Sequence, residues 1–246
     1  MKIDPLHRLK CAYWRWHAQA RATPAKPPPP PESARVPPAL RFACDLVIDV
    51  GANIGQYAAK LRASGYGGRI ISLEPLPDAH AQLAARAAAD PLWEVYPRCA
   101  LGAAAGTGTL NVAGNSVSSS LLPMLDLHAE AAPESTYTGQ VETPIVTLDS
   151  LLEHGVEAAR RPYLKIDTQG FEADVLTGGA EILSRIHAVE IELSLAPLYA
   201  GQQSWRWFID FFEARGFHIW ELRSAFRDPR DGRMLQMDGI FRRPEA

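Results

Sequence analysis

The chain has 246 residues, a formal net charge of −3, and 47% hydrophobic and 9% aromatic residues, which is enough apolar material for one main α/β domain with a sizeable core. The small net charge makes nucleic acid an unexpected partner, because nucleic-acid-binding domains carry a basic excess. Cys11, Cys44 and Cys99 are scattered without CxxC spacing, and no apolar run is long enough to cross a bilayer, so we expect a cytoplasmic protein without a zinc cluster or a disulfide framework.

Residues 1–22 predict a short amphipathic helix with a basic side. Such a helix either docks on the inner face of the membrane or on a protein partner, or rests on its own domain or a second subunit. Residues 23–38 are proline-rich and predict an extended linker, because proline lacks the backbone donor that helices and sheets need. The helical spacing involves Leu6, Leu9, Tyr13 and Trp16, and the basic residues are Arg8, Lys10, Arg15 and Arg21.

Residues 39–246 form the predicted catalytic domain, in which apolar β-like runs alternate with helical patterns. This alternation predicts a parallel sheet with helices on both faces. Between two short β-like pieces, residues 113–139 read as a long serine-rich loop, either a substrate-selecting lid or a disordered surface loop. Near the C-terminus, a turn-rich stretch at 224–233 joins two β-like runs and predicts a hairpin that gives the sheet an antiparallel edge.

The segment "LVIDVGANIGQYAAKL", residues 46–61, predicts a strand, a glycine turn and a helix. Gly51 allows a tight turn that exposes amides at a helix N-terminus, as in nucleotide sites. The turn departs from the GxGxxG dinucleotide fingerprint, and Asp49 stands where a pyrophosphate binder would avoid a carboxylate. This disfavours an NAD(P)-dependent oxidoreductase and favours a ligand with an ammonium group.

The next β-like run ends in Glu74, whose carboxylate suits the two hydroxyls of a ribose. A nucleoside with an amino-acid tail is S-adenosylmethionine, which we therefore predict as the cofactor. The structural alternative is that Asp49 caps the helix and Glu74 is a solvated strand end.

Two further acids are candidates for catalysis. Asp167 ends the β-like run "YLKID" and is our first candidate for a general base or an orienter of the acceptor hydroxyl, with a helix-capping role as the alternative. Glu190 and Glu192 share one face of a later strand, and Glu192 lies nearer the strand end, where it suits substrate binding or base work unless it is a structural ion-pair partner. Asp167, Glu192 and Asp238 carry oxygens of the kind magnesium prefers, but their spacing does not establish a metal site.

The glycine-turn segment, the run that ends in Glu74 and the run that contains Asp167 resemble the FkbM family of methyltransferases, together with "CALG", "VTLDSLL", "IELSLAPLY" and "DGIF". The resemblance extends from about Asp45 to Phe241, and "LKIDTQGFE" is its most specific element. The resemblance implies an α/β, Rossmann-like class I methyltransferase fold, with a mostly parallel seven-stranded sheet and an antiparallel C-terminal strand. It also implies O-methylation of a hydroxyl on a sugar or glycan, a polyketide or a related natural product. A homo-oligomer and a non-catalytic binding module with this fold stay open. By resemblance, the residues around the methionine tail are Asp49, Gly51, Asn53 and Gly55, with Glu74 at the ribose and Cys99 and Ala100 near the adenine.

Overall fold

The structure is a computed structural model that describes residues 36–244. The predicted N-terminal helix and most of the predicted linker lie outside the described residues. The folded unit begins at Val36, and its first helix, α2 (Pro38–Arg41), opens on a proline, whose fixed φ suits a first helical turn. The last residues of the predicted linker therefore belong to the folded unit.

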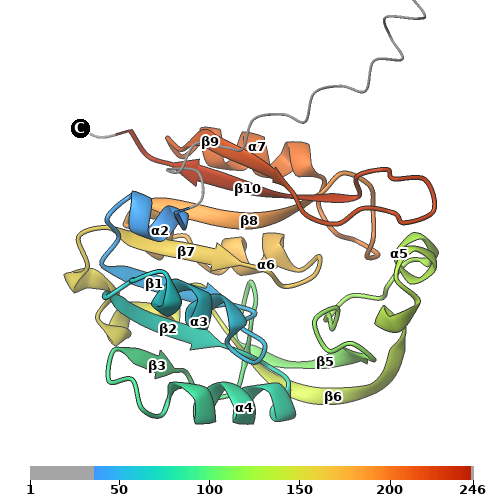
Figure 1. Cartoon of the computed structure of the whole chain (residues 1–246), viewed down its shortest axis with the longest axis horizontal. Helices are drawn as coiled ribbons and strands as arrows, with labels where there is room; N and C mark the ends of the chain where they lie inside the picture. Colours follow the sequence, from blue (N-terminus) through green and yellow to red (C-terminus); the bar gives the residue numbers. More distant parts are fainter. Residues whose placement is uncertain (1–35, 245–246) are drawn as a thin grey trace, which may run out of the picture. The chain divides into compact units, whose positions relative to one another are not determined.

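A seven-stranded sheet in the order β3-β2-β1-β7-β8-β10-β9 forms the centre (Figure 1). The first five strands in this order are parallel, and β10 pairs antiparallel with both β8 and β9. The predicted fold class and the C-terminal hairpin are thus confirmed, with the difference that the antiparallel strand is inserted one position inside the edge, which β9 occupies. The strands are β1 (Leu46–Val50), β2 (Arg69–Leu73), β3 (Trp93–Val95), β7 (Pro162–Ile166), β8 (Ala188–Ser194), β9 (His218–Ser224) and β10 (Gln236–Arg242).

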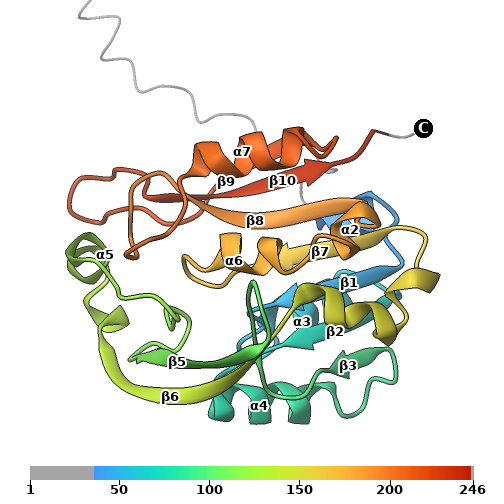
Figure 2. The ribbon, with the colours of Figure 1, turned by 180° about the vertical axis from the view of Figure 1, so that it is seen from behind.

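Helices cover both faces of this sheet, as the alternating pattern predicts. Residues of α2, α3 (Gln56–Ala63) and α4 (Pro77–Ala87) share one apolar cluster with one side of the strands. Residues of α6 (Glu172–Thr177) and α7 (Trp205–Glu213) share a second cluster with the other side (Figure 2). Because both faces are covered, every residue of β1 is buried, including the charged Asp49. Short 3-10 helices complete the second layer: η3 (Leu148–His154), η4 (Val156–Ala158) and η5 (Ile182–Ser184).

A small second sheet, β4-β6-β5, lies beyond the carboxyl ends of β1 and β2 (Figure 1). It consists of β4 (Ala100–Leu101), β5 (Gly106–Ala113) and β6 (Tyr137–Val146). The stretch between β5 and β6, which we expected to be irregular, instead contains α5 (Asp126–Ala131) and η2 (Pro133–Ser135). It is ordered because its apolar side chains, among them Met124 and Leu127, pack in a cluster with the buried Leu198 and Tyr199.

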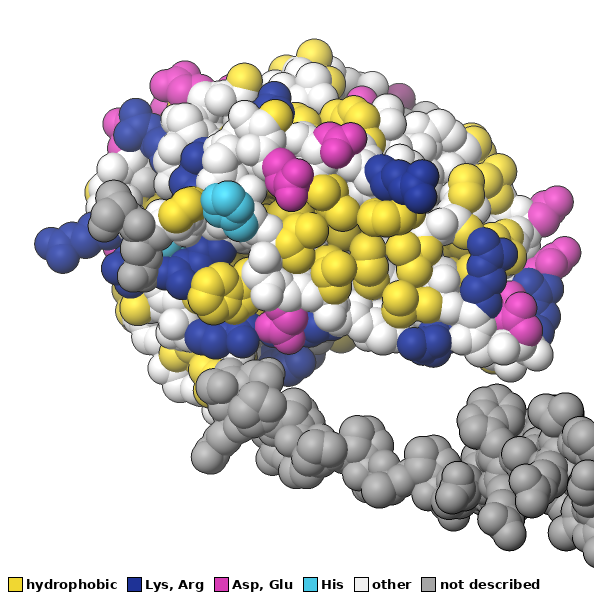
Figure 3. All heavy atoms as spheres, turned by 90° about the horizontal axis from the view of Figure 1, so that it is seen from above, with side chains coloured by type: hydrophobic (Ala, Val, Ile, Leu, Met, Phe, Trp, Pro, Cys, Tyr) yellow, Lys and Arg dark blue, Asp and Glu magenta, His cyan; other side chains and the backbone are white. Residues whose placement is uncertain are grey.

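The side of the molecule formed by α7 and β9 carries exposed apolar surface. Figure 3, seen from above this side, shows apolar side chains gathered in a patch bordered by charges of both signs. Phe208 and Phe212 of α7 point into the core, whereas Ile219 and Leu222 of the edge strand are exposed. Within residues 36–244, no helix combines the length and apolar character needed to cross a membrane.

Strands β1 and β7 approach each other closely at Gly51. This residue has a φ of +76°, and a Cβ added to it would overlap the carbonyl oxygen of Asp167. The position therefore requires glycine for two reasons: its backbone conformation and the lack of space for a side chain.

We predict that Gly51→Ala destabilises the protein far more than Gly65→Ala. Gly65 has a similarly positive φ of +89° but no atom within 4 Å of an added Cβ, so both variants incur the backbone cost of roughly 1–2 kcal/mol and only Gly51→Ala adds an overlap worth about 1–3 kcal/mol. Urea unfolding of the two variants measures the difference. Equal losses of unfolding free energy would contradict the close approach of β1 and β7.

Candidate functional site

A cavity of about 380 Å³ opens at the carboxyl ends of β1, β2 and β7, and its size lies in the range of ligand sites. Open α/β sheets bind ligands at this edge because the strand ends and the following turns present polar groups there. Six of the nine site residues predicted from the sequence line it: Gly51, Asn53, Glu74, Cys99, Ala100 and Asp167. The lining does not include Asp49, Gly55 or Glu192.

Glu74 is buried at the end of β2 and is not a solvated strand end, with 4% of its surface exposed. Its Oε2 accepts a hydrogen bond from the amide of Asn53 at 2.7 Å, and its Oε1 accepts one from the amide of Leu76 at 2.8 Å. Asn53 presents that amide because it adopts a left-handed φ of +48°, which asparagine tolerates. Burial raises the pKa of Glu74 to about 7, and each oxygen keeps a lone pair for a further donor.

Apolar side chains from the second sheet, from the segment after β5 and from the start of α6 form one wall of the cavity. Cys99 also lines the cavity, and burial raises the pKa of its thiol to about 11, so the thiol remains protonated near neutral pH. Asn53 Nδ2 donates to Ser116 Oγ at 3.2 Å and ties the glycine turn to the segment after β5. The wall residues are Leu101, Leu110, Leu121 and Phe171, and together they suit a flat, apolar group such as a nucleobase.

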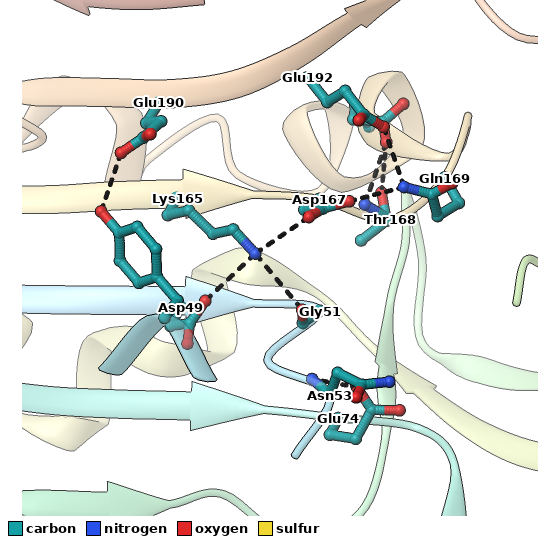
Figure 4. A network of polar contacts seen from close by, with 12 residues as sticks. Asp49, Gly51, Asn53, Glu74, Lys165, Asp167, Thr168, Gln169, Glu190 and Glu192 are labelled. Atoms are coloured by element: carbon teal, nitrogen blue, oxygen red, sulfur yellow. Dashed lines mark hydrogen bonds and ion pairs between the residues drawn. The ribbon is translucent and has the colours of Figure 1, made fainter. Parts of the chain in front are cut away.

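Asp49 lies behind the cavity wall, where it is fully buried and paired with Lys165. The two residues face each other across β1 and β7, because Asp49 is in register with Lys165. The ammonium Nζ of Lys165 lies 3.4 Å from Asp49 Oδ1, 3.3 Å from Asp167 Oδ2 and 3.4 Å from the carbonyl oxygen of Gly51 (Figure 4). Unlike Asp49, Lys165 does line the cavity.

The charges around Lys165 determine its protonation. Burial alone would lower the pKa of Lys165, but Asp167, Asp49 and Glu190 more than offset this and hold the pKa above its usual value. Burial also raises the pKa of Asp49, against the effect of Lys165. Sequence reasoning missed Lys165; a lone charged residue within the apolar run "PYLKI" was the available signal.

Gln169 joins the two predicted catalytic acids. Its side-chain amide Nε2 donates to Asp167 Oδ1 at 2.8 Å and to Glu192 Oε2 at 2.9 Å (Figure 4). Its Oε1 accepts from the Tyr199 hydroxyl at 2.8 Å, so the amide orientation is fixed from both sides. Gln169 adopts a left-handed φ of +55°, a conformation uncommon for glutamine, and sequence reasoning did not single it out.

Glu192 does not line the cavity but is linked through Gln169 to Asp167, which does. Its Oε2 also accepts from Gln236 Nε2 at 2.7 Å, and burial together with the neighbouring Asp167, Glu172 and Asp238 raises its pKa well above the usual value. In residues 36–244, no group of three or more His, Cys, Asp or Glu side chains is arranged to hold a metal ion.

Two further residues shape the turns around the cavity. Glu172 is buried and accepts hydrogen bonds at 3.0 Å from the amides of Thr168 and Gly170, which fixes the turn after Asp167. Burial raises its pKa to about 7. Gly55 has a φ of +82°, and a Cβ there would press on Leu83 and Trp93, so this residue serves the packing of α3.

A family model described as the methyltransferase FkbM domain matches residues 49–219, which include the end of β1, all of β7 and β8, and every predicted site residue. The chain belongs to the FkbM methyltransferase family. No curated protein matches the sequence.

Several solved structures resemble this FkbM domain. TehB from Haemophilus influenzae has a TM-score of 0.45 at 11% identity, over 84% of this chain and 60% of that chain. The 1,6-didemethyltoxoflavin-N1-methyltransferase of Burkholderia thailandensis has a TM-score of 0.43 at 14% identity, over 100% of this chain and 93% of that chain. Magnesium protoporphyrin IX methyltransferase from Synechocystis PCC 6803 has a TM-score of 0.43 at 11% identity, over 81% of this chain and 70% of that chain. The family assignment rests on the family model and not on these structures.

We predict that the buried acids make the protein less stable as pH rises. The folded-state pKa of Glu172, about 7, lies above the usual glutamate value of 4.5, so its protonated form stabilises the fold below pH 4.5 and this contribution is lost as pH rises through 7. The shift corresponds to roughly 3 kcal/mol. Urea unfolding between pH 5 and pH 8 should show a smaller decline for Glu172→Gln than for the wild type.

Glu213→Gln, a change at an exposed residue of α7, is the control and should keep the wild-type decline. A Glu172→Gln variant with the same pH dependence as the wild type would contradict the assignment of this titration to Glu172.

Proposed function

We propose that this FkbM-family protein is an S-adenosylmethionine-dependent O-methyltransferase. The observation that carries the proposal is the position of Glu74, a buried carboxylate with free lone pairs that lines the cavity at the end of β2. A carboxylate in this position suits the two hydroxyls of a ribose. When bound, S-adenosylmethionine supplies an activated methyl group on a sulfonium centre.

The residues present fit such a cofactor from end to end. Glu74 would hold the ribose, and the apolar wall beside Cys99 and Ala100 would hold the adenine. The turn from Gly51 to Asn53 would lie along the amino-acid tail. Asp49 would act at this end through its ion pair with Lys165, because its own side chain is fully buried.

Asp167 is the proposed catalytic residue. Its side chain is 39% exposed and lines the cavity, so it is accessible to an acceptor hydroxyl, from which a carboxylate can accept the hydrogen bond and the proton. Gln169 donates a hydrogen bond to one of its oxygens and Lys165 forms an ion pair with the other, which favours one orientation of the acceptor. Glu192 would assist through Gln169.

The proposed acceptor is a hydroxyl of a sugar or glycan, a polyketide or a related natural product. Hydroxyl side chains at the cavity, namely Ser116, Ser119 and Thr168, can exchange hydrogen bonds with a polyhydroxylated molecule. A dinucleotide-dependent oxidoreductase is not proposed, because the family is one of methyltransferases.

Three other expectations stay predictions. The protein acts in the cytoplasm, residues 1–22 dock on a membrane surface or on a protein, and a homo-oligomer forms in solution. The methyl-transfer assay also tests the alternative of a non-catalytic binding module. A protein that transfers no methyl groups but co-purifies with a stable partner would favour that alternative.

We predict that Glu74→Gln weakens binding of S-adenosylhomocysteine by roughly tenfold, the loss of a hydrogen bond to a charged acceptor. Because the ionised carboxylate is the better acceptor and its pKa is about 7, wild-type affinity should rise from pH 6 to pH 8, whereas Glu74→Gln should lack this rise. Calorimetry at three pH values measures both. A wild type that ignores S-adenosylhomocysteine and binds NADH would overturn the proposed function; equal binding by Glu74→Gln would overturn only the role of Glu74.

We predict that Asp167→Asn lowers methyl transfer at least tenfold while S-adenosylhomocysteine binding changes little, because general-base assistance contributes roughly 100-fold or more. Transfer of labelled methyl groups from S-adenosylmethionine to an extract of small metabolites and glycans is the measurement. Unchanged transfer would remove Asp167 from catalysis.

A further inference from the structure

Two lysines line the cavity, and they differ in setting. Lys60 stands on α3 and is exposed. Lys165 rises from the centre of the sheet on β7, and only 12% of its side chain is exposed. A buried cation that faces a cavity is costly unless it is compensated, and it interacts strongly with an anionic ligand group because little water screens it.

The contacts of Lys165 hold its charge without fixing its hydrogen bonds tightly. The contacts of its Nζ with the oxygens of Asp49, Asp167 and Gly51 are 3.3–3.4 Å long, whereas charge-assisted N–H···O bonds are typically about 2.7–2.9 Å. Neither carboxylate oxygen of Asp49 has a hydrogen-bond partner in the described structure, although both are buried. Asp49 is thus a counter-ion behind Lys165, and the ammonium can move toward an anion in the cavity without breaking a short bond.

The groups around this ammonium match the end of an α-amino acid. Such an end carries an ammonium and a carboxylate on one carbon atom. The carbonyl oxygen of Gly51, which contacts Lys165 Nζ, can also accept a hydrogen bond from the ammonium of the ligand. The carboxylate of the ligand instead requires a cation or a hydrogen-bond donor. We propose that Lys165 binds the carboxylate of the amino-acid end of S-adenosylmethionine and that Asp49 positions it for this role. This inference rests on the proposed function and adds a residue that recognises one part of the cofactor.

The test compares S-adenosylmethionine with decarboxylated S-adenosylmethionine, which lacks only the carboxylate. Calorimetric Kd values are measured for the wild type, Lys165→Met and Lys60→Met. Lys165→Met should weaken S-adenosylmethionine binding by roughly 10- to 100-fold, the loss of a charge-assisted contact, and should change the Kd of the decarboxylated ligand by less than about threefold. Lys60→Met, the matched control, should leave the ratio of the two Kd values at its wild-type value.

Lys165→Met leaves Asp49 buried without its counter-ion, so the double variant Asp49→Asn/Lys165→Met is measured beside it. It removes one positive and one negative charge, so the net charge of the site is unchanged, and it should show the same selective loss of S-adenosylmethionine binding. Thermal melting shows which of the two variants is folded, and the Kd values of the folded variant are the ones compared with the wild type.

The outcomes separate this inference from the proposed function. A wild type that binds neither ligand overturns both. A wild type that binds S-adenosylmethionine, with a Lys165→Met variant that loses both ligands equally or neither, overturns the role of Lys165 alone, because a structural residue or one directed at the acceptor would behave so. A selective loss in Lys60→Met would assign the carboxylate to Lys60 and overturn the inference as well.

Discussion

The ion pairs of one buried lysine connect the strand ends that form the site. Lys165 lies between Asp49 of β1 and Asp167 at the end of β7, and its ammonium also contacts the Gly51 carbonyl. This arrangement is available only because Gly51 lacks a side chain and lets the two strand ends meet. Removing the lysine charge would leave a carboxylate buried in the sheet without compensation, which costs far more than the pair contributes. Sheet geometry and site electrostatics therefore depend on the same few atoms.

Features encoded locally could be predicted from the sequence. The strand, turn and helix around Gly51 follow from neighbouring residues, and so do the apolar strands and the C-terminal hairpin. Glu74 and Asp167 could be placed at the cavity because parallel strands end at one edge of a sheet, so that position along each strand is enough. The position of β10 between β8 and β9 could not be predicted from local sequence, because strand order is set by packing between distant segments.

Features that depend on cross-strand register or on loop packing escaped. Lys165 faces Asp49 through the register of β1 with β7, which no local pattern records. Gln169 links Asp167 to Glu192 from a left-handed backbone conformation, which no local sequence pattern predicts at a glutamine. Residues between β5 and β6 looked irregular because their order comes from packing on Leu198 and Tyr199, far along the chain. Glu192 has the strand-end position expected of a site residue, yet Gln169 lies between it and Asp167, the acid that lines the cavity.

That intervening amide gives Glu192 a role that its position alone does not suggest. Burial and three neighbouring acids raise the pKa of Glu192 well above its usual value, which disfavours its ionised form. Asp167, linked to it through Gln169 Nε2, has a partly exposed side chain at the cavity. Environments that differ in this way assign different tasks to neighbouring carboxyl groups. Asp167 is the acid of the pair that faces the cavity, while Glu192 accepts from the Gln169 amide that orients Asp167.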